Sequence, residues 1–333
     1  MKLAKLVAAA ALGVCIFAGY AEAQLKVVMN NDGSALSIKG KAMQIWKNEI
    51  EKRMGKDAQV ELHNAGSLFD QKSQIAGVQL GEAHVIAPAI GIYTSIAPKI
   101  STLILPFLLQ TPTQIQAAID DPVIQKSFSA DLDRRNIKLL AVWSNGPKDF
   151  FYRTNKPILV PEDMKGVKFR VQAVPADIEA MKVMGANPVA MTWTEVPTAF
   201  QQGVIDAIEP SPNAVISAGM AESIKHVTKI GYQYSFFVVG VSKSWWEGLS
   251  DQNRKALTAS LAVATDWVNK NAALADADAY RILTEKGAVT HEITPEQRAM
   301  WTETVKPILK TFGSDLAGEA VIKRLKEIAA TVK

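Results

Sequence analysis

The fold is decided by residues 157–212, which read PILVPEDMKGVKFRVQAVPADIEAMKVMGANPVAMTWTEVPTAFQQGVIDAIEPSP. Residues 167–171 alternate apolar and charged side chains, as a strand does, and a helix start follows at a proline. A short strand at 189–191, a helix over 193–202 and a further strand opening at Val204 continue the pattern. The order strand–helix–strand–helix–strand is typical of an α/β fold with a parallel sheet.

The residue of this stretch that carries chemistry is Arg170, which lies on the first predicted strand just before a loop. A guanidinium in that position can meet a carboxylate with two parallel N–H bonds. An arginine paired with a structural Asp or Glu is the alternative. The local pattern leaves both interpretations open.

Three blocks in the same stretch, PEDMKGVKFRV, MGANPVAM-W-EV and FQQGVIDAIE, occur in order at tight spacing. Together they resemble the signature of the periplasmic solute-binding proteins of TRAP transporters, the DctP-type family. The resemblance implies a two-lobed periplasmic-binding-protein-like fold, with a ligand cleft between the domains and a long bracing helix. It also implies that Arg170 clamps a carboxylate of a small organic acid, and that the partners are the small and large membrane subunits of a TRAP permease.

The first 23 residues read as a secretory signal peptide, with a short basic start, an apolar run over 6–20 and a small-x-small site ending at Ala23. The run is too short for a membrane span, and polar sequence follows at once. We therefore expect cleavage after Ala23 and localisation in the periplasm. The only cysteine, Cys15, lies inside this segment, so the mature chain has no disulfide and no thiol chemistry.

Length and charge bound the remaining possibilities. The chain of 333 residues is 48% apolar and has a net charge of +4, with no basic run, which gives no argument for nucleic acid as a partner. Two domains are expected at this length. We place domain I at 24–146 plus about 232–265, and domain II at 147–231 plus about 266–333. The turn-like residues at 144–147, Ser-Asn-Gly-Pro, mark the expected first crossover.

Two further segments bear on the site and the fold. A polar loop at 30–34 follows the first predicted strand, where open α/β sheets place ligands, and makes Asn31 a candidate. An ordinary Asn/Gly turn is an equally good interpretation of that loop. Residues 251–287 are helical in pattern without a breaker, which predicts a helix on the order of 50 Å long.

No residue pattern predicts an enzyme. The four histidines are far apart in the sequence and lack metal-ligand spacing, so we expect neither metal nor cofactor. A nucleophile elbow, a phosphate-binding glycine loop and a marked carboxylate pair are also missing from the sequence. A receptor of another periplasmic uptake or sensing system, or a periplasmic hydrolase, remain the alternatives.

The resemblance implies further pocket residues. Trp193 falls where the family has an aromatic that packs on the ligand, with inter-helix packing as the alternative. Gln172 faces the same side of the strand as Arg170. Pro210 stands where the family often has an asparagine after the glutamate of its D-G-x-E-N segment, and Asn213 is a possible substitute.

Where many members carry a second arginine, this chain has Lys148, with Asp149 beside it to compete for the charge. Phe150 belongs to an aromatic run, 150–152, that can form strand core or supply an aromatic wall. Arg153, just past that run, is the reserve cation. These departures favour a monocarboxylate with an apolar or aromatic body over a C4-dicarboxylate.

Overall fold

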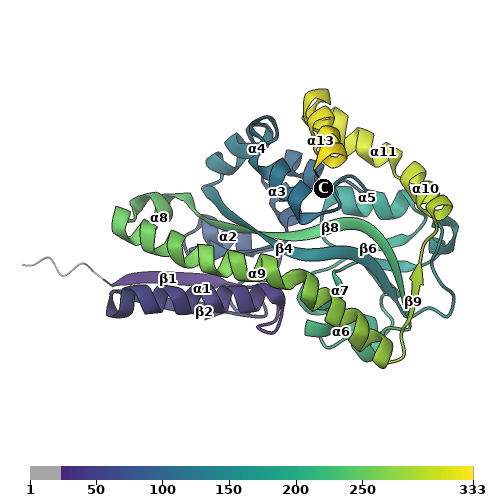
Figure 1. Ribbon diagram of the computed structural model, residues 1–333, viewed down its shortest axis with the longest axis horizontal. Coiled ribbons are helices and arrows are strands. Elements are labelled where there is room, and N and C mark those ends of the chain that lie inside the picture. The colour runs from purple at the N-terminus through teal and green to yellow at the C-terminus, as the bar shows by residue number, and fades with distance from the viewer. Residues whose placement is uncertain (1–23, 333) are drawn as a thin grey trace, which may run out of the picture.

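The computed structural model describes residues 24–332 and has one mixed sheet that runs through two lobes (Figure 1). The predicted signal peptide, with Ala23, lies outside the described residues. The strand order is β2-β1-β3-β8-β4-β7-β5-β6, and β9 pairs with β8. Among residues 24–332, no helix is both long and apolar enough to cross a membrane.

The strands are β1 (Leu25–Asn30), β2 (Ala58–His63), β3 (Val85–Ile86), β4 (Ile137–Tyr152), β5 (Lys168–Val171), β6 (Asn187–Ala190), β7 (Ala207–Ile208), β8 (His226–Ser242) and β9 (Val289–Glu292). The α-helices are α1 (Ile38–Met54), α2 (Gln74–Gln79), α3 (Pro112–Asp120), α4 (Pro122–Arg134), α5 (Pro175–Val183), α6 (Val196–Gln201), α7 (Pro212–Ser217), α8 (Lys243–Gly248), α9 (Asp251–Glu285), α10 (Pro295–Thr304), α11 (Lys306–Leu309), α12 (Asp315–Ala317) and α13 (Glu319–Thr331).

The first lobe is built on the parallel strands β1, β2 and β3, and the second on the parallel strands β5, β6 and β7. In the second lobe the predicted strand at Val204 begins later, at Ala207. The reason is local: the N–H of Val204 still bonds to the carbonyl of Ala199, so this residue belongs to the turn that ends α6. Gly203, with φ of 73°, makes that turn possible.

The two lobes share the long antiparallel strands β4 and β8. The turn predicted at 144–147 was wrong. Residues 144–147 form no turn but lie within β4, paired with β8 across register shifts. Gly146 has φ of 122°, and a Cβ there would lie 1.9 Å from an oxygen of Asp276 on α9. The glycine and Pro147 therefore mark an irregular stretch of strand, where proline is tolerated, rather than a chain reversal.

The helix α9, green in Figure 1, spans 35 residues and lies across both lobes. Ser250 caps its N-terminus by accepting a hydrogen bond from the N–H of Asn253. Leu257 and Leu261 pack into the core of the first lobe, which also contains Trp46 of α1. Leu283, near the other end, packs into the core beneath α6 and α7. The predicted long bracing helix is confirmed.

The chain ends on helices that cover the same side of the sheet as α3, α4 and α5 (Figure 1). This C-terminal part is divided into short helices, because breaks and a π-helical turn at Lys310–Ser314 separate α10, α11 and α12. Trp301 anchors them: its indole is fully buried and donates a hydrogen bond to the carbonyl of Leu159, 2.9 Å away.

Candidate functional site

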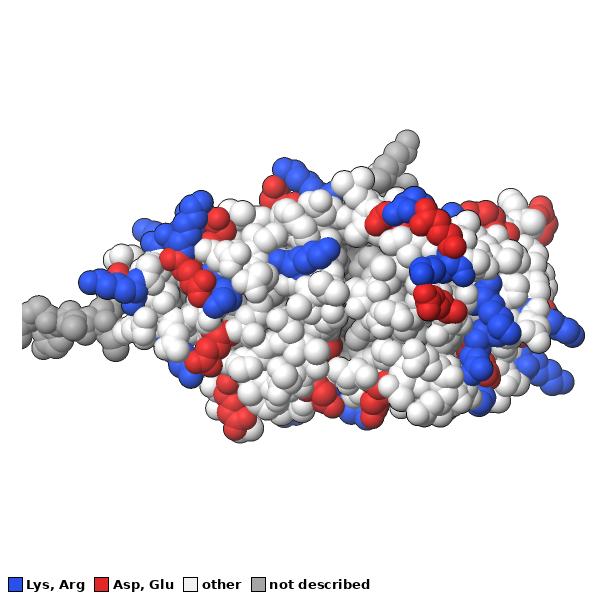
Figure 2. Space-filling model, turned by 90° about the horizontal axis from the view of Figure 1, so that it is seen from below, with Lys and Arg blue, Asp and Glu red and all other residues white. Residues whose placement is uncertain are grey.

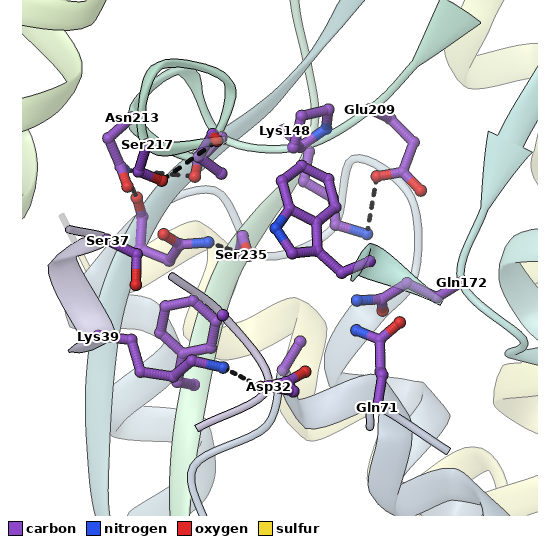
Figure 3. A pocket seen from close by; sticks show the side chains of 18 of the residues that line it. Asp32, Ser37, Lys39, Gln71, Lys148, Gln172, Glu209, Asn213, Ser217 and Ser235 are labelled. Atoms are coloured by element: carbon purple, nitrogen blue, oxygen red, sulfur yellow. Dashed lines mark hydrogen bonds and ion pairs between the residues drawn. The ribbon is translucent and has the colours of Figure 1, made fainter. Parts of the chain in front are cut away.

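A pocket lies between the lobes, and the long strands form its back wall (Figure 3). The empty space between its side chains amounts to about 610 Å³, part of it open to solvent. Figure 2 shows a face of the molecule that is hollowed between the lobes, with charges of both signs around it. The lining residues are Asp32, Gly33, Ser37, Lys39, Gln71, Ala89, Asn145, Lys148, Arg170, Gln172, Trp193, Glu209, Pro210, Ser211, Asn213, Ala214, Ser217, Ser235 and Phe237.

Arg170 of β5 lies in this pocket with only 2% of its surface exposed. Its Nε and Nη2 donate to the carbonyl of Met191 at 3.2 and 2.9 Å, and Nη2 also donates to Oε1 of Gln71 at 3.3 Å. Within the described chain no carboxylate lies within salt-bridge distance of the guanidinium, and its Nη1 makes no hydrogen bond. Burial lowers the pKa of Arg170, although Glu209 and Asp177 oppose that effect. The predicted alternative of a structural ion pair is therefore not what the structure contains.

Two glutamines, Gln71 and Gln172, line the pocket with their amide groups close to each other (Figure 3). Gln172, predicted from its place on the strand, is 8% exposed and lines the pocket. Gln71 comes from the loop before α2 in the first lobe, and its contact with Arg170 joins the two lobes. Nothing in the local sequence around Gln71 marks it as a site residue. The Arg170 end of the pocket is therefore rich in N–H donors.

Trp193 lines the pocket, with its ring centroid 5.5 Å from the guanidinium carbon of Arg170. It also packs against the core of the second lobe, which is the alternative role predicted for it, and its packing on a ligand stays a prediction. Pro210 lines the pocket as well. Phe150 does not: its ring is fully buried and packs edge-on against Phe169 and Trp301. Phe150 therefore belongs to the strand core, and the idea that it forms an aromatic wall of the pocket is corrected.

Lys148 lines the pocket, but its charge is already engaged by two buried carboxylates. Its Nζ lies 3.4 Å from Glu209 and 3.7 Å from Asp177. Burial alone would lower the pKa of Lys148, yet Asp177 and then Glu209 outweigh it and hold that pKa above its usual value. Burial raises the pKa of Glu209, an effect that Lys148 only partly opposes.

The competitor for Lys148 was misidentified from the sequence. Asp149 points away from the pocket, because alternate residues of a strand face opposite sides. Its carboxylate accepts hydrogen bonds from the hydroxyl of Tyr280 and from the N–H of Gly231. Arg153, the reserve cation, donates to the carbonyl of Phe200 and does not line the pocket.

The loop after β1 contributes an ion pair that the sequence analysis missed. Lys39 of α1 pairs with Asp32, both almost fully buried, and the Lys39 ammonium lies 4.5 Å from the ring centroid of Phe237. Asn31, the residue predicted in this loop, does not line the pocket. Its side chain accepts from the N–H of Gly33 and donates to Asn64, as in the turn that was the alternative interpretation.

Asn213 is held at the end of the pocket near α7 by the bracing helix. Its Nδ2 donates to the carboxylate of Asp276 and to the carbonyl of Asn145, each at 2.7 Å, and its backbone N–H donates to Asp276 at 3.1 Å. Burial raises the pKa of Asp276 to about 7, although the bonds from Asn213 oppose it. Asp276 therefore positions Asn213 without lining the pocket itself.

We expect Asp276 to make the ligand-free protein less stable as pH rises from about 4 to about 7. The unfolded chain gives up this proton near pH 3.8, whereas the folded chain retains it to about pH 7. Folding is therefore favoured less once the unfolded chain alone has ionised, and the loss is complete above pH 7. Urea unfolding at about pH 5 and about pH 8 measures it. Asp276→Asn should flatten this dependence, whereas Asp278→Asn on the exposed face of α9 should not; an unchanged slope in Asp276→Asn would contradict the assignment.

The histidines, which are far apart in the sequence, include one pair that is in contact in the fold. His226 of β8 and His291 of β9 approach to 3.1 Å between ring nitrogens, because these strands pair in parallel. No third histidine, cysteine or carboxylate joins them to form a metal cluster within residues 24–332. The pair lies outside the pocket.

The chain is similar to known solute-binding proteins in sequence and in fold. The family model described as "Bacterial extracellular solute-binding protein, family 7" (DctP) matches residues 29–315. The chain is 27% identical over 285 residues to the C4-dicarboxylate-binding periplasmic protein DctP of Rhodobacter capsulatus, covering 85% of each. It is 29% identical over 221 residues to the 2,3-diketo-L-gulonate-binding periplasmic protein YiaO of Escherichia coli, covering 66% of this chain and 67% of that one.

Among solved structures, a TRAP periplasmic solute-binding protein from Shewanella oneidensis with bound succinate superimposes with a TM-score of 0.87 at 25% identity. The match covers 92% of this chain and all of that one (100%). The two-lobed fold with a cleft between the lobes is thus shared with a receptor that was solved with its ligand.

Proposed function

The chain belongs to the DctP family, family 7 of the bacterial extracellular solute-binding proteins, and we propose that it captures a small organic acid through Arg170 in the periplasm. It then delivers the acid to a TRAP permease made of a small and a large membrane subunit. Relatives named as periplasmic binding proteins for organic acids support the first part of this proposal.

The observation that carries the proposal is a buried cation without an anion. Arg170 is 2% exposed, and the groups that it contacts, the carbonyl of Met191 and the amide of Gln71, are neutral. A buried charge is costly unless it is paired. A ligand carboxylate on Nη1 would supply the missing charge, and the amides of Gln71 and Gln172 offer further donors to its oxygens.

The two lobes suit capture by closure. The cavity is lined from the first lobe, the second lobe and the strands between them, so a ligand held there touches all three. The bond from Arg170 to Gln71 crosses between the lobes, and it would be exchanged for bonds to the ligand. A ligand that contacts both lobes favours their closed arrangement by its differential affinity for that state.

The pocket favours a receptor over an enzyme. Its serines and carboxylates have no histidine beside them, since none of the four histidines lines it. A hydrolase would require an activated nucleophile or water within hydrogen-bond reach of a base.

Mass spectrometry of the small molecules released from denatured protein tests the proposal. We expect a carboxylic acid from the wild-type chain and none from Arg170→Ala purified in parallel. The recovered acid, added back and incubated with the protein, should be returned unchanged. Release of no carboxylic acid, together with no thermal shift from any acid tested, would contradict the proposed function, and its conversion to a product would establish an enzyme.

A further inference from the structure

We propose that the acid held by this receptor is a hydroxylated monocarboxylate, whose hydroxyl groups are bound by Asn145, Asn213 and the neighbouring serines. This inference rests on the proposed function, because it assigns the carboxylate to Arg170. It goes further by naming the chemistry at the other end of the ligand.

The end of the pocket formed by β4, β8 and α7 holds two buried acceptors without donors. Oδ1 of Asn145 and Oδ1 of Asn213 have no hydrogen-bond partner within the described chain, although the residues are only 5% and 7% exposed. The orientation of Asn213 is fixed, because its Nδ2 donates to Asp276 and to the carbonyl of Asn145; in Asn145, Nδ2 donates to the hydroxyl of Ser235 at 2.9 Å. Each oxygen therefore remains an acceptor that a ligand donor can satisfy.

Two serine hydroxyls beside these amides complete the pattern. Ser235 accepts from Asn145, and Ser211 accepts from Asn213 at 3.3 Å, yet neither hydroxyl hydrogen has an acceptor among residues 24–332. The subsite thus combines free acceptors with free donors. A ligand hydroxyl satisfies both kinds of group, because it donates once and accepts twice.

A second carboxylate does not fit this end. Lys39 is paired with Asp32, and Lys148 with Glu209 and Asp177, so neither lysine is an unpaired cation. A dicarboxylate would bring its distal charge against the two asparagine oxygens. Burying that charge without a partner is strongly unfavourable.

An apolar chain and an ammonium group fit less well than a hydroxyl. An apolar chain leaves the two amide oxygens and the two serine hydroxyls unpaired, which is how a polar site rejects an analogue that lacks its hydroxyl. An ammonium group satisfies the oxygens but offers no acceptor to the serines. Most of the residues that line the pocket are polar, and aromatic rings join them at Trp193 and Phe237. The hydroxylated body is therefore proposed in place of the apolar or aromatic body expected from the sequence.

The experiment compares acids of matched chain length by calorimetry and thermal shift. The pairs are glycerate with propionate, threonate with butyrate, and gluconate with hexanoate; succinate, malate and the amino acid serine complete the panel. We expect at least one hydroxylated monoacid to bind at least about tenfold more tightly than its unhydroxylated partner and than every other member of the panel.

Variants test whether Asn213 and Ser235 produce the preference for hydroxylated acids. Ser235→Ala and Asn213→Ala should each reduce, by severalfold, the ratio of the affinity for the hydroxylated acid to that for its unhydroxylated partner. Asn48→Ala, on the exposed face of α1, should leave this ratio unchanged. The melting temperature of each variant without ligand reports whether it folds. Arg170→Ala should abolish binding of all monoacids. Tighter binding of an unhydroxylated acid, a dicarboxylate or serine, still dependent on Arg170, would overturn this inference and leave the proposed function standing. A ratio unchanged in both folded subsite variants would also overturn it, and a wild-type protein that binds no acid at all would overturn both.

Discussion

Replacing Arg170 by alanine should weaken binding of the carboxylate ligand by at least about thirtyfold and leave the fold intact. Truncating one partner of a buried, hydrogen-bonded charge pair costs roughly 2–5 kcal/mol of binding free energy, because the other charge is left unpaired. Here that other charge is the ligand carboxylate, which would meet only the neutral amides of Gln71 and Gln172.

The effect on stability separates this role from a structural one. An arginine buried in a structural ion pair would destabilise the protein strongly when removed. Arg170 makes no salt bridge to a carboxylate in residues 24–332, so its removal breaks no buried ion pair, and Glu209 and Asp177, which act on its charge from further away, keep Lys148 as their partner. We therefore expect urea unfolding of the ligand-free Arg170→Ala protein to differ little from that of the wild type.

Calorimetry with the acid identified by mass spectrometry measures the loss of affinity in Arg170→Ala. Arg170→Lys should also bind poorly, because an ammonium group cannot reproduce the planar array of guanidinium donors. Arg53→Ala, at the exposed end of α1, is the matched control. An Arg170→Ala protein that binds with wild-type affinity would remove this residue from the site.

The sequence predicted Arg170 because its evidence is local: a strand, a following loop and three ordered blocks lie within one short stretch. Gln71 could not be found in this way, since it becomes a neighbour of Arg170 only when the lobes meet. The loop after β1 reaches the pocket, but it is Asp32, paired with Lys39, that lines it, and not the predicted Asn31. Which residue of a loop faces a cavity depends on its turn geometry, which composition does not reveal.

Long-range packing also explains the remaining errors. The Ser-Asn-Gly-Pro sequence at 144–147 has turn chemistry, yet pairing with β8 and the approach of Asp276 from α9 keep it in a strand. Phe150 and Lys148 lie two residues apart, and both were predicted as ligand-binding residues. The twisted, irregular pairing of β4 sends one into the core and the other to the pocket.

Lys148→Met should destabilise the protein by about 3–5 kcal/mol near pH 8, the second large effect that we expect. Lys148 is the cation paired with both Asp177 and Glu209, which are each 1% exposed. Without it two carboxylates remain buried with no salt-bridge partner, and removal of one member of a buried ion pair typically costs this much. A methionine fills similar volume, so cavity formation contributes little.

The pH dependence of this loss identifies its cause. Burial already raises the pKa of Glu209, and Lys148 is the first of the groups that oppose it, so the pKa should rise further in the variant. A proton then neutralises Glu209, and the difference in stability between variant and wild type should shrink as pH falls from about 8 to about 5.

Adding Glu209→Gln to Lys148→Met should recover part of the lost stability, since one of the two unpaired buried carboxylates is then neutral. Urea unfolding measures the stability of the wild type, the two single variants Lys148→Met and Glu209→Gln, and the double variant. Lys138→Met, exposed on the same strand, is the control. A Lys148→Met protein as stable as the wild type at pH 8 would mean that the two carboxylates are held neutral without the lysine.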